Sequence, residues 1–188
     1  MELIGLYLIG AGLLCVAGVA KAARPDDTAR ALAALVPGTP PLRLVRWIVR
    51  VGALAEAALG AVAIFFPRPA IAALVALSYV GFFGFVAFAR WRGGPLATCG
   101  CFGRPDTPPT ALHLIIDLVL TAAAVAVVAT GARGDGTLAT HLAHQPGAGL
   151  PLLFVSAVGL WLTALALSSL AALTGVRRLA RPVPVQAS

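Results

Sequence analysis

Long apolar runs are the feature that most constrains this chain, because each is close to the roughly 20 residues that a helix needs to cross a bilayer. Five such runs lie at about Leu3–Ala20, Trp47–Phe66, Pro69–Phe88, from after Pro109 to Thr130, and Leu150–Thr174. Charged residues make up 11% of the chain and gather between the runs, whereas soluble domains carry about 25%. The sequence therefore predicts an all-α fold, a polytopic membrane helix bundle.

The predicted bundle has a four-helix core and one further crossing. We expect a transmembrane core over 1–131, an extramembrane loop over 132–149, a fifth C-terminal transmembrane helix over 150–175 and a basic tail over 176–188. Between the first two runs, Pro25, Asp26 and Asp27 are typical of a helix start, and Pro37-Gly38 is typical of a stop. We therefore also expect a short interfacial helix in this first loop.

The net charge of +7 is interpreted as a topology signal. The basic residues flank the apolar runs and form no stripe with interleaved aromatic residues, so they do not indicate nucleic-acid binding. Twelve Lys and Arg, including Lys21, fall on the side of the first loop, and only Arg68 and Arg133 fall on the other. This bias predicts an outside N-terminus and a cytoplasmic C-terminus, in a bacterial cell (inner) membrane.

The start of the chain is predicted to be a transmembrane helix that is retained. A secretory signal needs positive charge ahead of its apolar run, but here Glu2 precedes the run and Lys21 and Arg24 follow it.

The stretch "LATCGCFGRP" places Cys99 and Cys101 one residue apart, just before the fourth apolar run. A disulfide between such close neighbours is strained and hence labile, and the start of a helix favours a thiolate. The pattern therefore favours a redox pair. The alternatives are two thiols packed in a tight turn, or half of a metal site that only Cys15 and His113 would complete; we expect no metal.

Two carboxylates lie within predicted spans, where ionisable groups are costly and usually functional. Glu56 and Asp117 should lie roughly 14 and 12 Å from the thiol side of the membrane, given 1.5 Å of rise per residue. His113 precedes Asp117 by one turn on the same helix face. We predict that these three residues line one polar cavity, which Cys15 and the Cys99–Cys101 turn could also join, and that the three form a proton path. The alternative is that the carboxylates are neutral packing groups between helices, and Cys15 is interpreted as a small core residue.

Glycines within the predicted spans indicate where helices approach closely. They are Gly52, Gly60, Gly81 and Gly84.

Three stretches, "AGVAKAARPDD", "LAEAALG" and "CGCFG", resemble the methylamine-utilisation MauE family, which is itself similar to the DoxX-like membrane proteins. The resemblance covers roughly residues 1 to 130. It implies a four-helix core and a role in maturing exported proteins, of the methylamine dehydrogenase type, beside a thioredoxin-fold partner. Carried over to this chain, it implies that Cys99 and Cys101 form the redox pair and that Glu56 is a family-like polar position.

The arrangement is also similar to vitamin K epoxide reductase and to the quinone-coupled disulfide-forming enzymes, which makes quinone a possible cofactor. Those enzymes use a second cysteine pair in a loop, whereas the first loop here has no cysteine, so a partner must supply the other dithiol. The main hypothesis is a thiol–disulfide oxidoreductase. The alternatives are a non-catalytic assembly or maturation factor and, less favoured because the chain has no internal repeat, a small-molecule or metal transporter.

Overall fold

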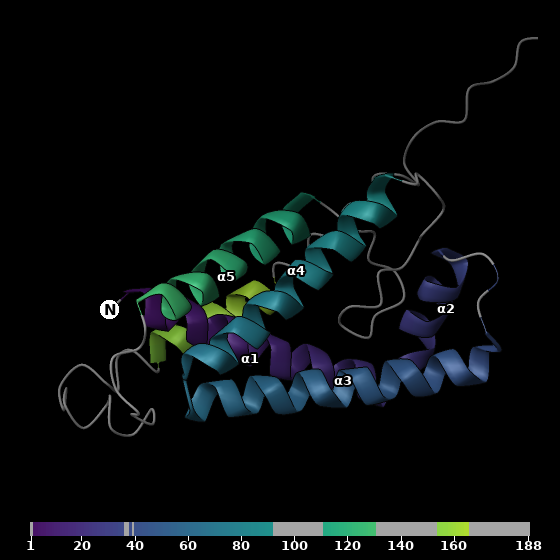
Figure 1. Cartoon of the computed structure of the whole chain (residues 1–188), viewed down its shortest axis with the longest axis horizontal. Helices are drawn as coiled ribbons and strands as arrows, with labels where there is room; N and C mark the ends of the chain where they lie inside the picture. The colour runs from purple at the N-terminus through teal and green to yellow at the C-terminus, as the bar shows by residue number, and fades with distance from the viewer. Residues whose placement is uncertain (1, 36–37, 39, 92–110, 131–153, 166–188) are drawn as a thin grey trace, which may run out of the picture.

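The structure, a computed structural model, describes residues 2–35, 38, 40–91, 111–130 and 154–165 of the chain. Over these residues the protein is all-helical (Figure 1). The helices are α1 (Glu2–Ala23), α2 (Pro25–Leu35), α3 (Leu42–Phe65), α4 (Pro69–Trp91), α5 (Ala111–Ala129) and a shorter helix, Phe154–Leu165. The predicted redox pair, Cys99 and Cys101, lies outside the described residues.

Four of the helices, α1, α3, α4 and α5, are long and apolar enough to cross a membrane. This confirms the four-helix core of a multi-pass membrane protein. The predicted boundaries differ by a few residues, because α3 begins at Leu42 rather than at Trp47 and α4 continues to Trp91 rather than ending at Phe88. Of the predicted fifth span, the structure describes only Phe154–Leu165, which is apolar.

The outer surfaces of the long helices are apolar. Val51 on α3, Leu77 on α4 and Leu118 on α5 are each 60% exposed or more. A soluble protein rarely leaves such a surface in water, so these side chains face the hydrocarbon of the bilayer.

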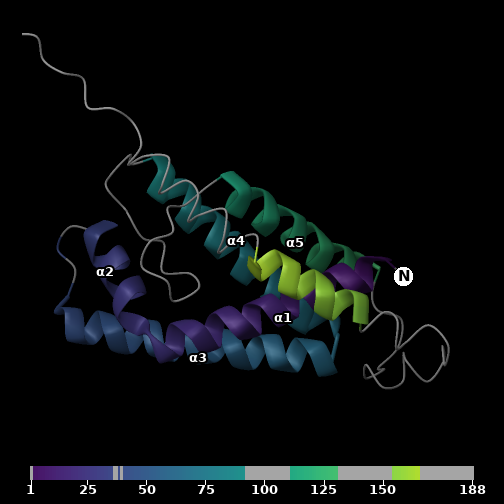
Figure 2. The same ribbon diagram turned by 180° about the vertical axis from the view of Figure 1, so that it is seen from behind.

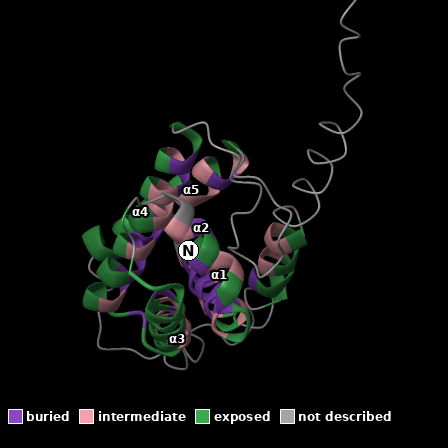
Figure 3. Ribbon diagram, turned by 90° about the vertical axis from the view of Figure 1, so that its right-hand side faces the viewer, coloured by how far each residue is buried: buried purple, intermediate pink, exposed green. Residues whose placement is uncertain are grey.

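Helix α1 is the centre of the bundle, as its largely buried surface in Figure 3 shows. In its most apolar window 56% of the residues are buried, against 17 to 28% in the other three spanning helices. Two glycines allow α1 to approach α3 closely. A Cβ on Gly18 would lie 2.6 Å from the Ala57 backbone nitrogen, and one on Gly60 would lie 2.6 Å from the Ala11 carbonyl oxygen.

The glycine prediction is thus correct for Gly60 and wrong for three other positions. A Cβ added to Gly52, Gly81 or Gly84 would meet no atom within 4 Å. These three glycines leave open space beside α3 and α4 rather than a close helix contact.

Helix α2 is the predicted short helix of the first loop, and it begins at Pro25 as expected. Its first turn carries Asp26 and Asp27, which suit the positive end of a helix dipole. Asp26 pairs with Arg46 of α3, which fastens α2 to the start of that helix. The following Gly38 has a φ of 77°, in the left-handed region that favours glycine.

Helices α3 and α4 form the least closed part of the bundle. Helix α1 packs along α3, and α4 packs along α5, but α3 and α4 contact each other over a short length only. From their connection near Arg68, the two helices diverge toward the end of the bundle where α2 lies (Figures 1 and 2). The polar residues of the spans gather in this diverging half.

Candidate functional site

An ion pair between Lys21 and Glu56 joins two spanning helices. The Lys21 Nζ atom of α1 donates a hydrogen bond to Glu56 Oε2 of α3. The Lys21 side chain is 10% exposed and that of Glu56 is 24% exposed. The same Nζ lies 4.5 Å from the centre of the Phe82 ring on α4, in cation–π geometry. Three helices therefore converge on one ammonium group.

Lys21 is the residue that sequence reasoning missed. The charge pattern marks it as one of the basic residues that set the topology, but it is buried in the last turn of α1 and paired with Glu56. A signal for the pairing does exist in the sequence. A carboxylate inside a span needs a partner, and Lys21 is the cation of the preceding span.

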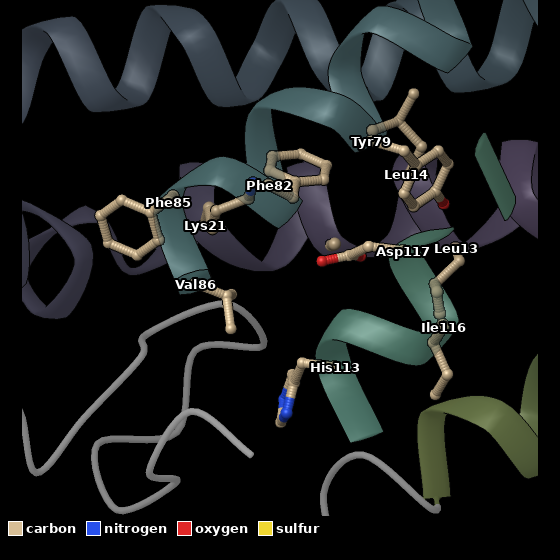
Figure 4. Close-up of a pocket in the computed structure, with 11 residues that line it drawn as sticks. Leu13, Leu14, Lys21, Tyr79, Phe82, Phe85, Val86, His113, Ile116 and Asp117 are labelled. Carbon is tan, nitrogen blue, oxygen red and sulfur yellow. The ribbon is translucent and has the colours of Figure 1, made fainter. Parts of the chain in front are cut away.

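A small cavity of about 60 Å³ lies between α1, α4 and α5, and is here called the inner cavity. Its polar lining residues are Lys21, Tyr79, His113 and Asp117. Figure 4 shows the Asp117 carboxyl group projecting from α5 toward the space beside α1 and α4. The rest of the lining is apolar and aromatic, so the carboxyl group lies in a largely apolar environment.

His113 lies in the first turn of α5 and is buried. It lines the inner cavity together with Asp117, so the two residues predicted to share a helix face do border one space. Figure 4 shows the imidazole directed away from the Asp117 carboxyl group. The pair therefore borders the cavity at two separate points.

A second cavity, here called the outer cleft, lies between the diverging α3 and α4 and has a volume of about 420 Å³. Lys21 of α1 and Thr28 and Leu32 of α2 also line it. Glu56 and Lys21 contribute charged groups to its wall, and Gly52 and Gly81 lie along it. Lys21, Phe82 and Phe85 border both cavities. Glu56 thus faces the outer cleft and Asp117 the inner cavity, with the Lys21 ammonium and two aromatic rings between them.

Tyr79 lines the inner cavity and bonds to α1. Its buried hydroxyl donates a hydrogen bond of 2.6 Å to the Gly10 carbonyl oxygen of α1, and its ring meets Phe82 edge to face at 5.8 Å between centres. Sequence reasoning did not single out Tyr79, because a tyrosine in an apolar run has no signature that distinguishes a buried hydroxyl from one at the interface.

Cys15 has a free thiol and is half-buried in α1. Its backbone packs against Gly60, and it lines neither cavity. The expectation that Cys15 joins the polar cavity is therefore wrong, and its packing fits the core role that we favoured. Among the described helices, no three His, Cys, Asp or Glu side chains gather as metal ligands would.

The helical spans, their lipid-facing surface and the charged groups enclosed between them define a multi-pass membrane protein with a polar site inside the bilayer. Residues 2–130 match the family model described as methylamine utilisation protein MauE. The chain belongs to this family, which links it to methylamine utilisation. No curated protein and no solved structure matches the chain significantly.

Proposed function

We propose that this protein is a membrane thiol–disulfide oxidoreductase that exchanges electrons through Cys99 and Cys101 with a thioredoxin-fold partner, in the maturation of exported proteins. The family link to methylamine utilisation supports a maturation role. The thiol pair itself, one residue apart and ahead of α5, supports the redox chemistry.

The proposal rests on where the inner cavity lies relative to the two helix ends that flank Cys99 and Cys101 in the chain. The segment that holds both cysteines connects Trp91, the end of α4, to Ala111, the start of α5. These two helices form the walls of the inner cavity together with α1. His113 is within one turn of the point where α5 begins. The polar groups of the inner cavity therefore lie toward the two helix ends that this segment connects in the chain.

The exchange moves two electrons and two protons. A dithiol of the partner attacks the Cys99–Cys101 disulfide through a mixed disulfide, which leaves the partner oxidised and both cysteines reduced; the reverse direction balances equally. Where a quinone accepts the electrons, it takes two electrons and two protons and becomes a quinol. Asp117, His113 and Glu56 are the groups we assign to carry those protons. The inner cavity of about 60 Å³, which Asp117 and His113 line, is large enough for water, and Glu56 lines the outer cleft.

The orientation that we propose has the thiols in the cytoplasmic half. Removing the buried, paired Lys21 from the charge count leaves eleven basic residues against two. The bias toward a cytoplasmic thiol side thus survives the correction.

The proposal is tested by trapping mixed disulfides with a thioredoxin-fold protein, for which bacterial thioredoxin serves. Cys99→Ser and Cys101→Ser are compared singly and together, with Cys15→Ser as the matched control. We expect one single variant to accumulate the mixed disulfide, because its resolving thiol is missing, and the double variant to form none. Maturation of the exported protein that continues in the double variant would instead favour a non-catalytic assembly factor.

A further inference from the structure

We propose that the outer cleft between α3 and α4 binds a neutral, membrane-dissolved ligand that presents a carbonyl oxygen to Lys21 and has an apolar body. Binding in this cleft does not depend on the chemistry of the two thiols.

The shape of the cleft follows from two features of the helices. Helices α3 and α4 diverge, and at Gly52 and Gly81 they present no side chain to the space between them. A Cβ at either glycine would meet nothing within 4 Å. The resulting volume of about 420 Å³ lies within the range of small-molecule sites, roughly 300 to 1,000 Å³. The space is therefore large enough for a ring-sized group.

The lining of the cleft matches a ligand with an apolar body. Its walls are formed largely by Leu32, Val49, Ala53, Phe82 and Phe85. Both of the diverging helices span the membrane and expose apolar side chains on their outer surfaces. A ligand that reaches the cleft sideways, between α3 and α4, thus comes from the bilayer, which selects for a lipophilic molecule.

The charged groups of the cleft select the polar end of the ligand. The Lys21 ammonium has three N–H donors, of which Glu56 accepts one in the part of the chain that the structure describes. Because Glu56 also balances the charge of Lys21, an anionic ligand gains little net attraction. A neutral oxygen acceptor gains a hydrogen bond from a cation, which is stronger than one from a neutral donor.

The carbonyl has two sources in a membrane, a quinone ring and a phospholipid ester, and photolabelling distinguishes them. The full chain in lipid nanodiscs is exposed either to a photoreactive short-chain ubiquinone or to a phosphatidylcholine with a diazirine in its acyl chain. The labelled residues are then mapped by mass spectrometry. We expect labels on α3 and α4 around the cleft.

Gly81→Leu tests occupancy, because the new side chain fills the cleft without a clash at Cβ. Gly84→Leu is the matched control, since Gly84 has equal free space on the same helix but does not line the cleft. We expect Gly81→Leu to reduce labelling at least tenfold and Gly84→Leu to leave it unchanged. Thermal unfolding of both variants checks that the bundle is intact.

Each outcome bears on the proposal. Gly81-dependent labelling by the ubiquinone probe supports a quinone ligand, and Gly81-dependent labelling by the lipid probe supports an ester ligand. Equal labelling of the two leucine variants by both probes would overturn the site. The double variant Cys99→Ser/Cys101→Ser should label like the unmodified chain, so failure of the thiol chemistry is distinguishable from failure of the cleft. A loss of labelling in that variant would contradict binding that is independent of the thiols.

Discussion

Lys21 of α1 donates a hydrogen bond to Glu56 of α3, 35 positions later in the chain, and the pair is largely enclosed by the bundle. Either charge alone would be left in a poorly solvated place, because both side chains are less than a quarter exposed. Removing one partner leaves the other charge buried and unpaired. This destabilises the protein by more than the attraction between the two charges stabilises it.

We predict that Lys21→Met or Glu56→Gln each destabilises the protein by about 3 kcal/mol. The double variant Lys21→Met/Glu56→Gln should recover most of that loss, because it leaves no unpaired charge. The measurement is a double-mutant cycle, in which the free energies of unfolding of the unmodified chain, the two single variants and the double variant are compared in detergent micelles or bicelles. Arg30→Met is the control, since the exposed Arg30 forms a 2.5 Å ion pair with Asp27 on its own helix, worth at most about 1 kcal/mol. Additive single losses would contradict a coupled pair.

The buried Tyr79 hydroxyl is a second link to α1. Removing it in Tyr79→Phe leaves the Gly10 carbonyl without this donor, and we expect a loss of about 1 kcal/mol in the free energy of unfolding. The neighbouring Ser78→Ala is the control, because the Ser78 hydroxyl donates within its own helix, to the Leu74 carbonyl. Equal effects of the two variants would show that the bond between helices contributes nothing specific.

Two glycines of α3 should respond in opposite ways to the same substitution. Gly60→Ala forces α1 and α3 apart, because the new Cβ would lie 2.6 Å from backbone atoms of Ala11 and Cys15. We expect a lower thermal midpoint. Gly52→Ala meets nothing within 4 Å and should be neutral or slightly stabilising, since alanine favours a helix by up to about 1 kcal/mol over glycine. Similar midpoints for both variants would mean that the two helices do not pack at Gly60.

The elements that sequence reasoning predicts well are those set by local pattern. The four spans and the start of α2 at Pro25 depend on apolar length and on helix-starting residues, and both can be read from neighbouring positions. Gly60 and Gly52 look alike by the same reasoning, yet only Gly60 faces α1. Which side of a helix meets another depends on rotation in the bundle, which the almost uniformly apolar sequence of a span does not encode.

The candidate site shows the same limit. The depth estimate places Glu56 and Asp117 at one level, and both do border polar space in the same half of the bundle. The estimate does not reveal that they face two cavities, nor that Lys21 lies between them. The charge of Lys21 is equally consistent with a residue that sets the membrane topology and with a buried ion-pair partner of Glu56. Only the packing of α1 against α3 distinguishes the two roles.

The proton role that we propose for Asp117 predicts a kinetic effect. With reduced bacterial thioredoxin as the exchange partner, Asp117→Asn should slow reduction of the Cys99–Cys101 disulfide about a hundredfold, the scale of lost general acid–base catalysis. Thr121→Ala is the control, because the Thr121 hydroxyl donates a hydrogen bond to the Asp117 backbone carbonyl one turn away, not to its carboxyl group. Thermal unfolding checks the fold of both. Equal rates would leave Asp117 as a packing residue.

The charge bias predicts which face of the membrane carries the thiols. A membrane-impermeant maleimide added to intact cells of a Cys15→Ala variant should leave Cys99 and Cys101 unmodified, and permeabilised cells should label both after reduction. The matched control is Arg68→Cys in a chain without other cysteines. Arg68 is exposed in the turn between α3 and α4, at the opposite end of these helices from the thiol segment, so it should label from outside. The reverse labelling pattern would place the thiols outside, where disulfide-forming enzymes work. The Lys and Arg residues near Cys99 and Cys101 would then interact with something other than the cytoplasmic membrane surface.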